Sequence, residues 1–176
     1  MFWIQYIMQR PRYSTSIMLS IMKFTEQNGV RCYCMLHTED LEMLYCDTCG
    51  NWLHTVCCGF LSNTDKRIPD GEYTCLICSS LITKVECANA LFRQVISVIY
   101  NENFLGRSWL CNRLQIHPSR AYKNIQKMIR QGLLIPTKAH KGTVQYQVVT
   151  THAAKNTIKK HFSISAYPDP QKHSNS

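Results

Sequence analysis

The pattern of apolar and polar residues is clearest in the second half of the chain. Between Thr83 and Asn101, apolar residues recur every three or four positions, as they do on one face of a helix. These residues are Ala88, Leu91, Phe92, Val95, Val98 and Ile99. Thr83 and Glu86 have the spacing of a capping box, which satisfies the first backbone N–H groups of a helix. The pattern therefore predicts a helix from about Thr83 to about Asn101.

Two further helices are predicted after a turn at 103–107. Ser108 is expected to cap a short helix that contains Trp109, Leu110 and Leu114. Pro118 suits the first position of the next helix, which should run to about Gln131 and stop at Gly132. The residues of this third helix that should face inward are Ala121, Ile125, Met128 and Ile129.

Two strands follow in the predicted order. Segments 133–138 and 143–150 have strand-like composition and are separated by a turn at 139–142 that contains Gly142. Three helices followed by a β-hairpin are the layout of a winged helix-turn-helix domain, which we expect over 83–150. In that layout the third helix enters the major groove of DNA and the hairpin forms the wing.

A different pattern, of cysteines and one histidine, occupies the region before these helices. The pairs are Cys32-x-Cys34, Cys46-x-x-Cys49, His54-x-x-Cys57 and Cys75-x-x-Cys78. Each pair bends two ligand atoms towards one metal, so eight ligands are enough for two tetrahedral zinc sites. All four positions of each site would be filled by protein, which indicates structural zinc and leaves no place for a substrate.

A segment of about fifty residues buries too little apolar surface to fold well alone. Zinc binding would supply much of its folding free energy, on the order of 10 kcal/mol for each ion. The alternative is a disulfide framework, since the chain has ten cysteines. The His54-x-x-Cys57 pair argues against it, because disulfides have no use for a histidine. The remaining Cys58, Cys87 and Cys111 are expected to be small buried apolar residues.

The region with the cysteine pairs and the region with the predicted helices also differ in net charge. The net charge is +9, but 31–80 has three basic residues against seven acidic ones, a net charge of −4. Segment 84–160 has thirteen basic residues against two acidic ones, a net charge of +11. The acidic part suits a basic peptide such as a histone tail, and the basic part suits phosphates.

The third predicted helix and the predicted wing carry the residues expected to bind DNA. They are Arg120, Lys123, Asn124, Lys127, Arg130, Lys138 and Lys141. Lysine and arginine at this density bind phosphates, so the affinity should fall steeply with salt. Whether Arg120 or Asn124 also reads bases is left open.

The ligand order and the stretch from Leu41 to His54 resemble those of PHD fingers, and the resemblance covers 31–80. In that family the ligand pairs interleave. The resemblance therefore implies that Cys32, Cys34, His54 and Cys57 hold one zinc, and that Cys46, Cys49, Cys75 and Cys78 hold the other.

Some PHD fingers read methylated lysine, and the resemblance implies a histone-binding role for Met43, Asp47 and Trp52. Glu42 is expected to help attract a basic tail. Trp52 and Met43 would contact a trimethylammonium group through an aromatic face and a thioether. Such readers commonly place an aromatic residue just before the first cysteine, where this chain has Arg31. The alternative role of Trp52 is to pack the core of the finger.

A PHD finger followed at once by a winged helix resembles the central chromatin-binding region of the yeast meiotic HORMA-domain proteins of the chromosome axis. The resemblance covers roughly 31–150 and implies binding to nucleosomes. We therefore expect a small α+β, non-enzymatic nuclear protein with two structural zinc ions. Its expected partners are DNA, nucleosomes, histone tails and other chromosome-axis proteins, and no membrane.

The ends of the chain are less informative. Residues 1–30 are expected to be a lead-in to the finger, and 151–176 a basic and then disordered tail with little further helix.

Two alternatives to a chromatin binder stay open. One is a RING-like ubiquitin or SUMO ligase, which also uses two interleaved zinc ions. The other is a protein scaffold in which the winged helix binds another protein.

Overall fold

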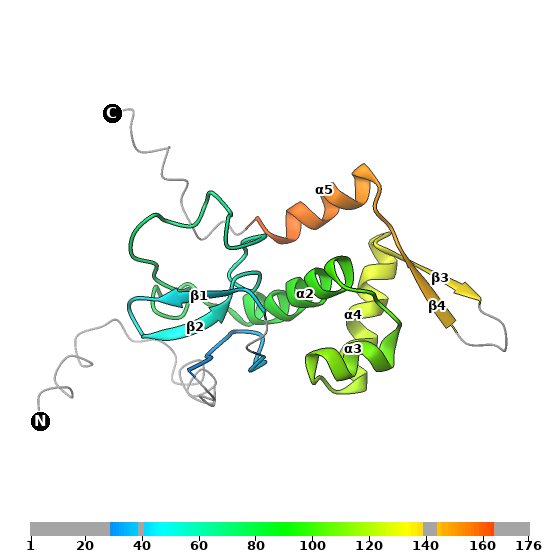
Figure 1. Cartoon of the computed structure of the whole chain (residues 1–176), viewed down its shortest axis with the longest axis horizontal. Coiled ribbons are helices and arrows are strands. Elements are labelled where there is room, and N and C mark those ends of the chain that lie inside the picture. Colours follow the sequence, from blue (N-terminus) through cyan, green and yellow to red (C-terminus); the bar gives the residue numbers. More distant parts are fainter. Residues whose placement is uncertain (1–28, 39–40, 139–143, 164–176) are drawn as a thin grey trace, which may run out of the picture.

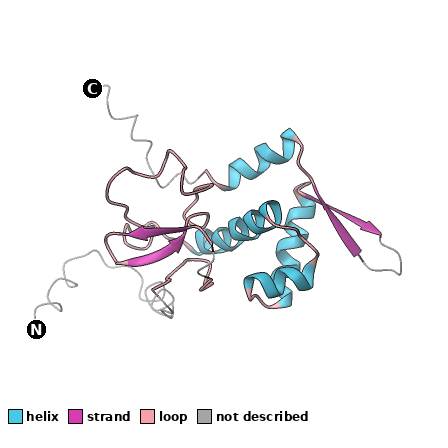
Figure 2. Cartoon of the chain, in the orientation of Figure 1, coloured by secondary structure: helices cyan, strands magenta, loops and turns pink. Residues whose placement is uncertain are grey.

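The computed structural model describes residues 29–38, 41–138 and 144–163, which form a zinc-finger part and a helical part (Figure 1). The finger part, 29–80, is mostly loops and turns around one small sheet (Figure 2). Strands β1 (Met43–Cys46) and β2 (Asn51–His54) pair antiparallel, with Tyr45 opposite Trp52. Gly50 closes the hairpin with a φ of +68°, a conformation that side chains with a Cβ rarely adopt.

Helix α2 (Lys84–Asn101) begins and ends where the sequence predicts. The Thr83 hydroxyl accepts the backbone N–H of Glu86 at 3.1 Å, which confirms the predicted N-cap. Of the residues predicted to face inward, Ala88 is exposed. The other five are buried, and so are Arg93, Gln94 and Ile96. The burial extends around the helix because α2 has the finger at one end and helices beside it (Figure 1).

Helices α3 (Arg107–Leu114) and α4 (Pro118–Arg130) follow in the predicted order. The expected cap at Ser108 is wrong: the N-cap is Gly106, whose φ of +120° favours glycine, and α3 has no side-chain cap. Pro118 takes the first position of α4, as predicted. Ala121, Ile125 and Met128 are fully buried, whereas the fourth predicted residue, Ile129, is only half-buried.

Strands β3 (Leu134–Lys138) and β4 (Val144–Val148) form the predicted hairpin, with Leu134 opposite Val148. The predicted turn at 139–142 lies outside the described residues. The Tyr100 hydroxyl at the end of α2 donates to the carbonyl oxygen of Val149 at 2.6 Å. This hydrogen bond fixes the base of the hairpin to the helical core.

Helix α5 (His152–His161) was not predicted, and the expectation of little helix after Thr150 is wrong. Thr151 caps its N-terminus by accepting the backbone N–H of Ala154. Only Ala154 is buried within the helix, followed by Phe162 just after it. So short an apolar face gives little periodic signal, and the helix is stabilised by packing back onto α2 and the finger.

Two arginines join the finger to the helical part. Arg93 in α2 is 1% exposed, and its guanidinium donates to the carbonyl oxygen of Cys57 at 2.8 Å and of His161 at 3.3 Å. Arg67 in the finger donates to the carbonyl oxygen of Phe162 at 2.7 Å and of Gly59 at 3.0 Å. Helix α5 thus returns the chain to the finger, as Figure 1 shows.

The described part of the chain contains no helix with the length and apolar character needed to cross a bilayer. Of the three cysteines outside the ligand series, Cys58 is buried, while Cys87 and Cys111 are half-buried.

Candidate metal centres and binding surfaces

The first predicted ligand set is assembled in the finger. Cys32, Cys34, His54 and Cys57 are all buried, and their ligand atoms lie within 4.8 Å of one another. His54 ends β2, and Cys57 lies in the turn that follows it. Tetrahedral zinc with bonds of about 2.3 Å needs ligand atoms roughly 4 Å apart, so this cluster fits the ion.

The orientation of His54 suits a zinc ligand. Its Nε2 lies 2.8 Å from the carbonyl oxygen of Thr38, so Nε2 carries the proton and donates it. Nδ1 is then unprotonated and lies 3.4 Å from the sulfur of Cys34. A carbonyl partner of this kind fixes both the tautomer and the ring of a metal-binding histidine.

The second ligand set connects the β1–β2 hairpin with the end of the finger. The ligand atoms of Cys46, Cys49, Cys75 and Cys78 also lie within 4.8 Å of one another, and Cys49 is exposed. The backbone N–H of Cys75 donates to the sulfur of Cys46 at 3.3 Å. The two centres therefore interleave along the chain, each taking alternate pairs.

The electrostatics of both clusters suit a divalent cation. In the first cluster, burial and the neighbouring thiols of Cys32 and Cys34 raise the pKa of Cys57 well above its usual range. In the second, burial opposes ionisation of Cys46, but N–H groups of Cys75 and Cys49 outweigh it and lower the pKa to about 7. Zinc supplies the positive charge that such crowded thiolates need, and it acts here as a structural ion.

Comparisons with known proteins agree with this geometry. Residues 25–80 match the family model described as "PhD finger domain". This part of the chain is a PHD finger. It has one cluster of three cysteines with a histidine and one cluster of four cysteines, which together can hold two zinc ions.

Three relatives extend the comparison. The chain is 31% identical over 117 residues to "Linear element-associated protein hop1" of Schizosaccharomyces pombe, covering 64% of this chain and 22% of that protein. It is 36% identical over 61 residues to "Probable histone-lysine N-methyltransferase lin-59" of Caenorhabditis elegans, covering 30% of this chain and 5% of that protein. It is 39% identical over 123 residues to "PHD finger protein 20" of Mus musculus, covering 70% of this chain and 10% of that protein.

The chain thus spans less than a quarter of the length of these curated relatives. The 117 residues aligned with hop1 are about twice the length of the finger match, so that similarity continues beyond the PHD finger. No solved structure matches the chain.

The predicted histone-binding residues lie on or beside the β1–β2 sheet. Trp52 is 45% exposed, and its ring centroid lies 5.1 Å from that of Tyr45, which is 41% exposed. Met43 is two residues from Tyr45 in β1 and therefore shares the same face of the sheet. Trp52 is exposed, so packing the finger core is not its main role.

Asp47 and Arg31 have structural partners in the finger. The Asp47 carboxylate accepts the backbone N–H of Tyr73 at 2.7 Å, and the Arg31 backbone N–H donates to the carbonyl oxygen of Trp52. Glu42 is exposed and accepts the backbone N–H of Asn63. Tyr45 was not among the residues predicted for this surface, although the alternation of a strand places it on the same face as Met43 and opposite Trp52.

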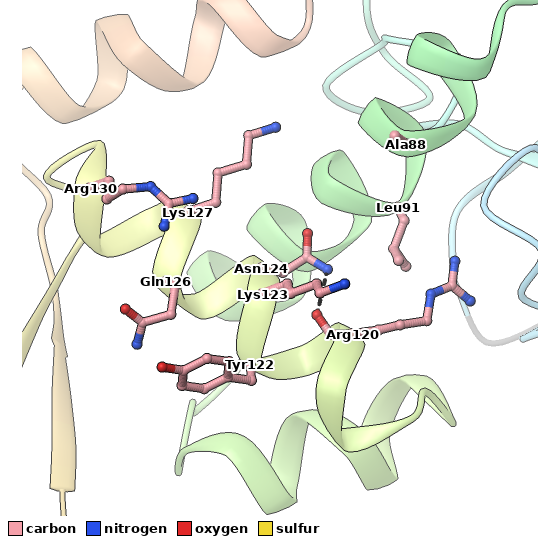
Figure 3. Close-up of a pocket in the computed structure, with 9 residues that line it drawn as sticks. All are labelled: Ala88, Leu91, Arg120, Tyr122, Lys123, Asn124, Gln126, Lys127 and Arg130. Carbon is pink, nitrogen blue, oxygen red and sulfur yellow. Dashed lines mark hydrogen bonds between the residues drawn. The ribbon is translucent and has the colours of Figure 1, made fainter.

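The predicted DNA-binding residues of α4 lie together. Arg120, Lys123, Asn124, Lys127 and Arg130 line an open hollow of about 690 Å³ between α4 and the first turns of α2 (Figure 3). Lys123 and Arg130 are exposed, and the other three are half-buried. The Asn124 amide donates to the carbonyl oxygen of Arg120 at 2.8 Å, which occupies one of its N–H groups.

Lys127 is held differently from its neighbours. Its ammonium nitrogen lies 3.8 Å from the centre of the Phe92 ring, a cation–π contact with α2. Burial and the nearby Arg130 and Arg93 lower the pKa of Lys127 below its ordinary value. Lys127 therefore stabilises the packing of α4 on α2, whereas the charged groups of Lys123 and Arg130 are exposed to solvent.

The two residues predicted to bind DNA from the wing are less fully described. Lys141 lies outside the described residues, and of Lys138 only the backbone, at the end of β3, is described.

The two acidic residues of segment 84–160 already have basic partners. Glu86 pairs with Arg93 at 3.3 Å, and Glu102 pairs with Arg113 through contacts of 2.6 and 2.7 Å. No acidic residue of this segment is left to balance its other lysines and arginines. A surface of one sign remains around α4, which attracts anions.

Proposed function

We propose that this chain is a chromatin-binding protein in which the PHD finger contacts histones and the helical part contacts DNA. The observation that carries the proposal is the cationic surface of α4, fixed to a PHD finger of opposite charge. Lys123 and Arg130 face solvent in a segment whose two acids are already paired. The names of the relatives support a chromosomal setting in the nucleus.

In this proposal α2 to β4 act as a winged helix. Helix α4 would lie in the major groove, and the β3–β4 hairpin would contact the adjacent backbone. The order of the helices and strands supports this role, as does a similarity to hop1 that continues beyond the finger. The same order of modules supports a place in meiotic chromosome-axis organisation and recombination.

The histone-facing surface would be the exposed face of the β1–β2 sheet. Tyr45 and Trp52 offer two aromatic faces at an angle of 59°, and Met43 adds a thioether on the same side. Two such faces attract a lysine or methylated lysine by cation–π contact, and the exposed carboxylate of Glu42 adds negative charge nearby. A basic histone tail would therefore be attracted here by the negative charge and by cation–π contact with the two rings.

The affinity for mononucleosomes, set beside that for naked DNA of the same length at near-physiological salt, tests the whole proposal. We expect tighter binding to nucleosomes, because both surfaces then contribute. Equal affinity would remove the histone contact and leave a DNA-binding protein. Binding to neither would overturn the proposal and favour the scaffold or ligase alternatives.

The DNA contact is tested by charge reversal at the two solvent-facing residues of α4. We expect Lys123→Glu with Arg130→Glu to weaken DNA binding and to lower the slope of log affinity against log salt by about 2, one unit for each phosphate contact. The matched control is Lys155→Glu with Lys160→Glu, the same charge change at two exposed positions of α5. Equal weakening by both pairs would show that only net charge matters.

A further inference from the structure

Gln94 is a fully buried polar residue of α2 that lies against the first metal centre. Its Oε1 is 3.5 Å from the sulfur of Cys57. Its Nε2 is buried and has no hydrogen-bond partner among the described residues. A buried amide nitrogen without a partner destabilises the folded state, so its position next to a zinc ligand needs an explanation.

Zinc binding changes what Cys57 requires. A zinc-bound cysteine is a thiolate, which has no S–H to donate and accepts hydrogen bonds instead. The amide oxygen of Gln94 and the carbonyl oxygen of Ala90 both lie 3.5 Å from this sulfur. Two oxygens facing a thiolate are unfavourable. A half-turn of the amide exchanges its oxygen and nitrogen, and brings an N–H donor to the sulfur.

We propose that Gln94 is a positioning residue of the first zinc centre, with its amide N–H donating to the thiolate of Cys57. The neighbouring Arg93 donates to the carbonyl oxygen of the same cysteine at 2.8 Å. Two consecutive residues of α2 thus hold Cys57 by its side chain and by its backbone. The helical part thereby helps to bind a zinc ion whose four ligands all belong to the finger.

The second centre provides an internal comparison. The sulfur of Cys46 accepts its hydrogen bond from the backbone N–H of Cys75, which belongs to the finger itself. Its ligand Cys49 is exposed to solvent, whereas every ligand of the first centre is buried. A change at Gln94 should therefore weaken one zinc site and leave the other unchanged.

The test uses the full chain loaded with two zinc ions and a competing chelator with a colour change. Gln94→Met keeps the length of the side chain and removes the donor. We expect one zinc equivalent to bind about 10- to 100-fold more weakly, as for other partners of metal ligands, and the second equivalent to bind as before. The matched control is Gln126→Met, the same change at a half-buried position of α4.

A spectroscopic readout separates this role from simple packing. In the cobalt-substituted protein, losing an N–H donor to a thiolate should shift the sulfur-to-cobalt charge-transfer band of one centre. Gln94→Glu, which puts a carboxylate against the thiolate, should weaken the first site more than Gln94→Met does. Equal weakening of both zinc sites, or unchanged affinity and spectra in both variants, would overturn the proposal.

Discussion

The finger and the helical part are stabilised in different ways. In the finger, the buried residues around the short sheet include six of the eight zinc ligands. In the helical part, the buried residues are mostly aliphatic, such as Val95 of α2, Leu110 of α3 and Ile125 of α4. A small unit that buries little apolar surface depends on metal, whereas a helical unit can depend on the hydrophobic effect.

One apolar cluster runs through both parts, and buried polar contacts also join them. Arg93 and Arg67 each donate to backbone carbonyl groups across the junction. Bonds from a charged donor to fixed carbonyls are directional, so they set the angle between the parts as well as joining them. The surfaces that we propose for histones and for DNA are therefore held in one geometry.

Removing zinc should have the largest effect on stability and should unfold the finger before the helical part. We expect a strong chelator to unfold the finger, because each structural zinc contributes on the order of 10 kcal/mol. The helical signal in circular dichroism should largely remain, while the finger becomes sensitive to protease. Cys49→Ser should reproduce the loss of the second site, and Cys111→Ser, at a cysteine outside the clusters, should not. Simultaneous loss of both parts would mean that they fold as one unit.

Removing the buried guanidinium at the junction should have the next largest effect. We expect Arg93→Met to lower the free energy of unfolding by about 3 kcal/mol, because it leaves two carbonyl groups and Glu86 without their donor. Urea unfolding would measure the change, and Arg107→Met, at an exposed arginine, is the control. A loss below about 1 kcal/mol would show that apolar contacts alone hold the parts together.

The smallest effect should be a pH dependence at the docking of α5. Burial, together with Lys127 and Arg93, lowers the pKa of His161, whose ring packs on Phe92 and bonds to Gln131. The folded state thus prefers the neutral ring, so this contribution is complete above the ordinary pKa of about 6.5. It is lost as the pH falls through the lowered value.

Thermal unfolding at several pH values between 7.5 and 5 would measure this loss. His161→Gln should flatten the dependence relative to wild type, while His152→Gln, at the exposed start of α5, should not. Zinc loss at low pH affects all three proteins and cancels in the comparison. Parallel curves for wild type and His161→Gln would remove this residue from the junction.

Features that depend on neighbouring residues were predictable from the sequence. The cap at Thr83, the start of α4 at Pro118 and the stop at Gly132 were all expected, because each depends on local backbone geometry. Both ligand sets were also expected, from pair spacing and family resemblance. Ser108 was wrong as a cap because a glycine with positive φ begins the helix two residues earlier.

Features that depend on distant residues were not predictable. The cation–π contact of Lys127 with the ring of Phe92 joins two different helices, so no local pattern in the sequence predicts it. Helix α5 has one buried residue within it, so the sequence has no periodic apolar pattern that would predict this helix. Arg93 and Gln94 look like ordinary polar positions of α2, and only the approach of Cys57 gives them a role.

The sequence by itself determined the two zinc sites, the order of the helices and strands, and the division of charge. The helices, the strands and the ligand pairs follow from residue type and local spacing, the grouping of the pairs into two sites follows from the family resemblance, and the division of charge follows from composition. Only the tertiary structure decided how the finger and the helical part are joined, which cations remain exposed, and that α2 lies against a zinc ligand. These depend on long-range packing, in which residues far apart in the sequence exclude water together and satisfy one another's polar groups.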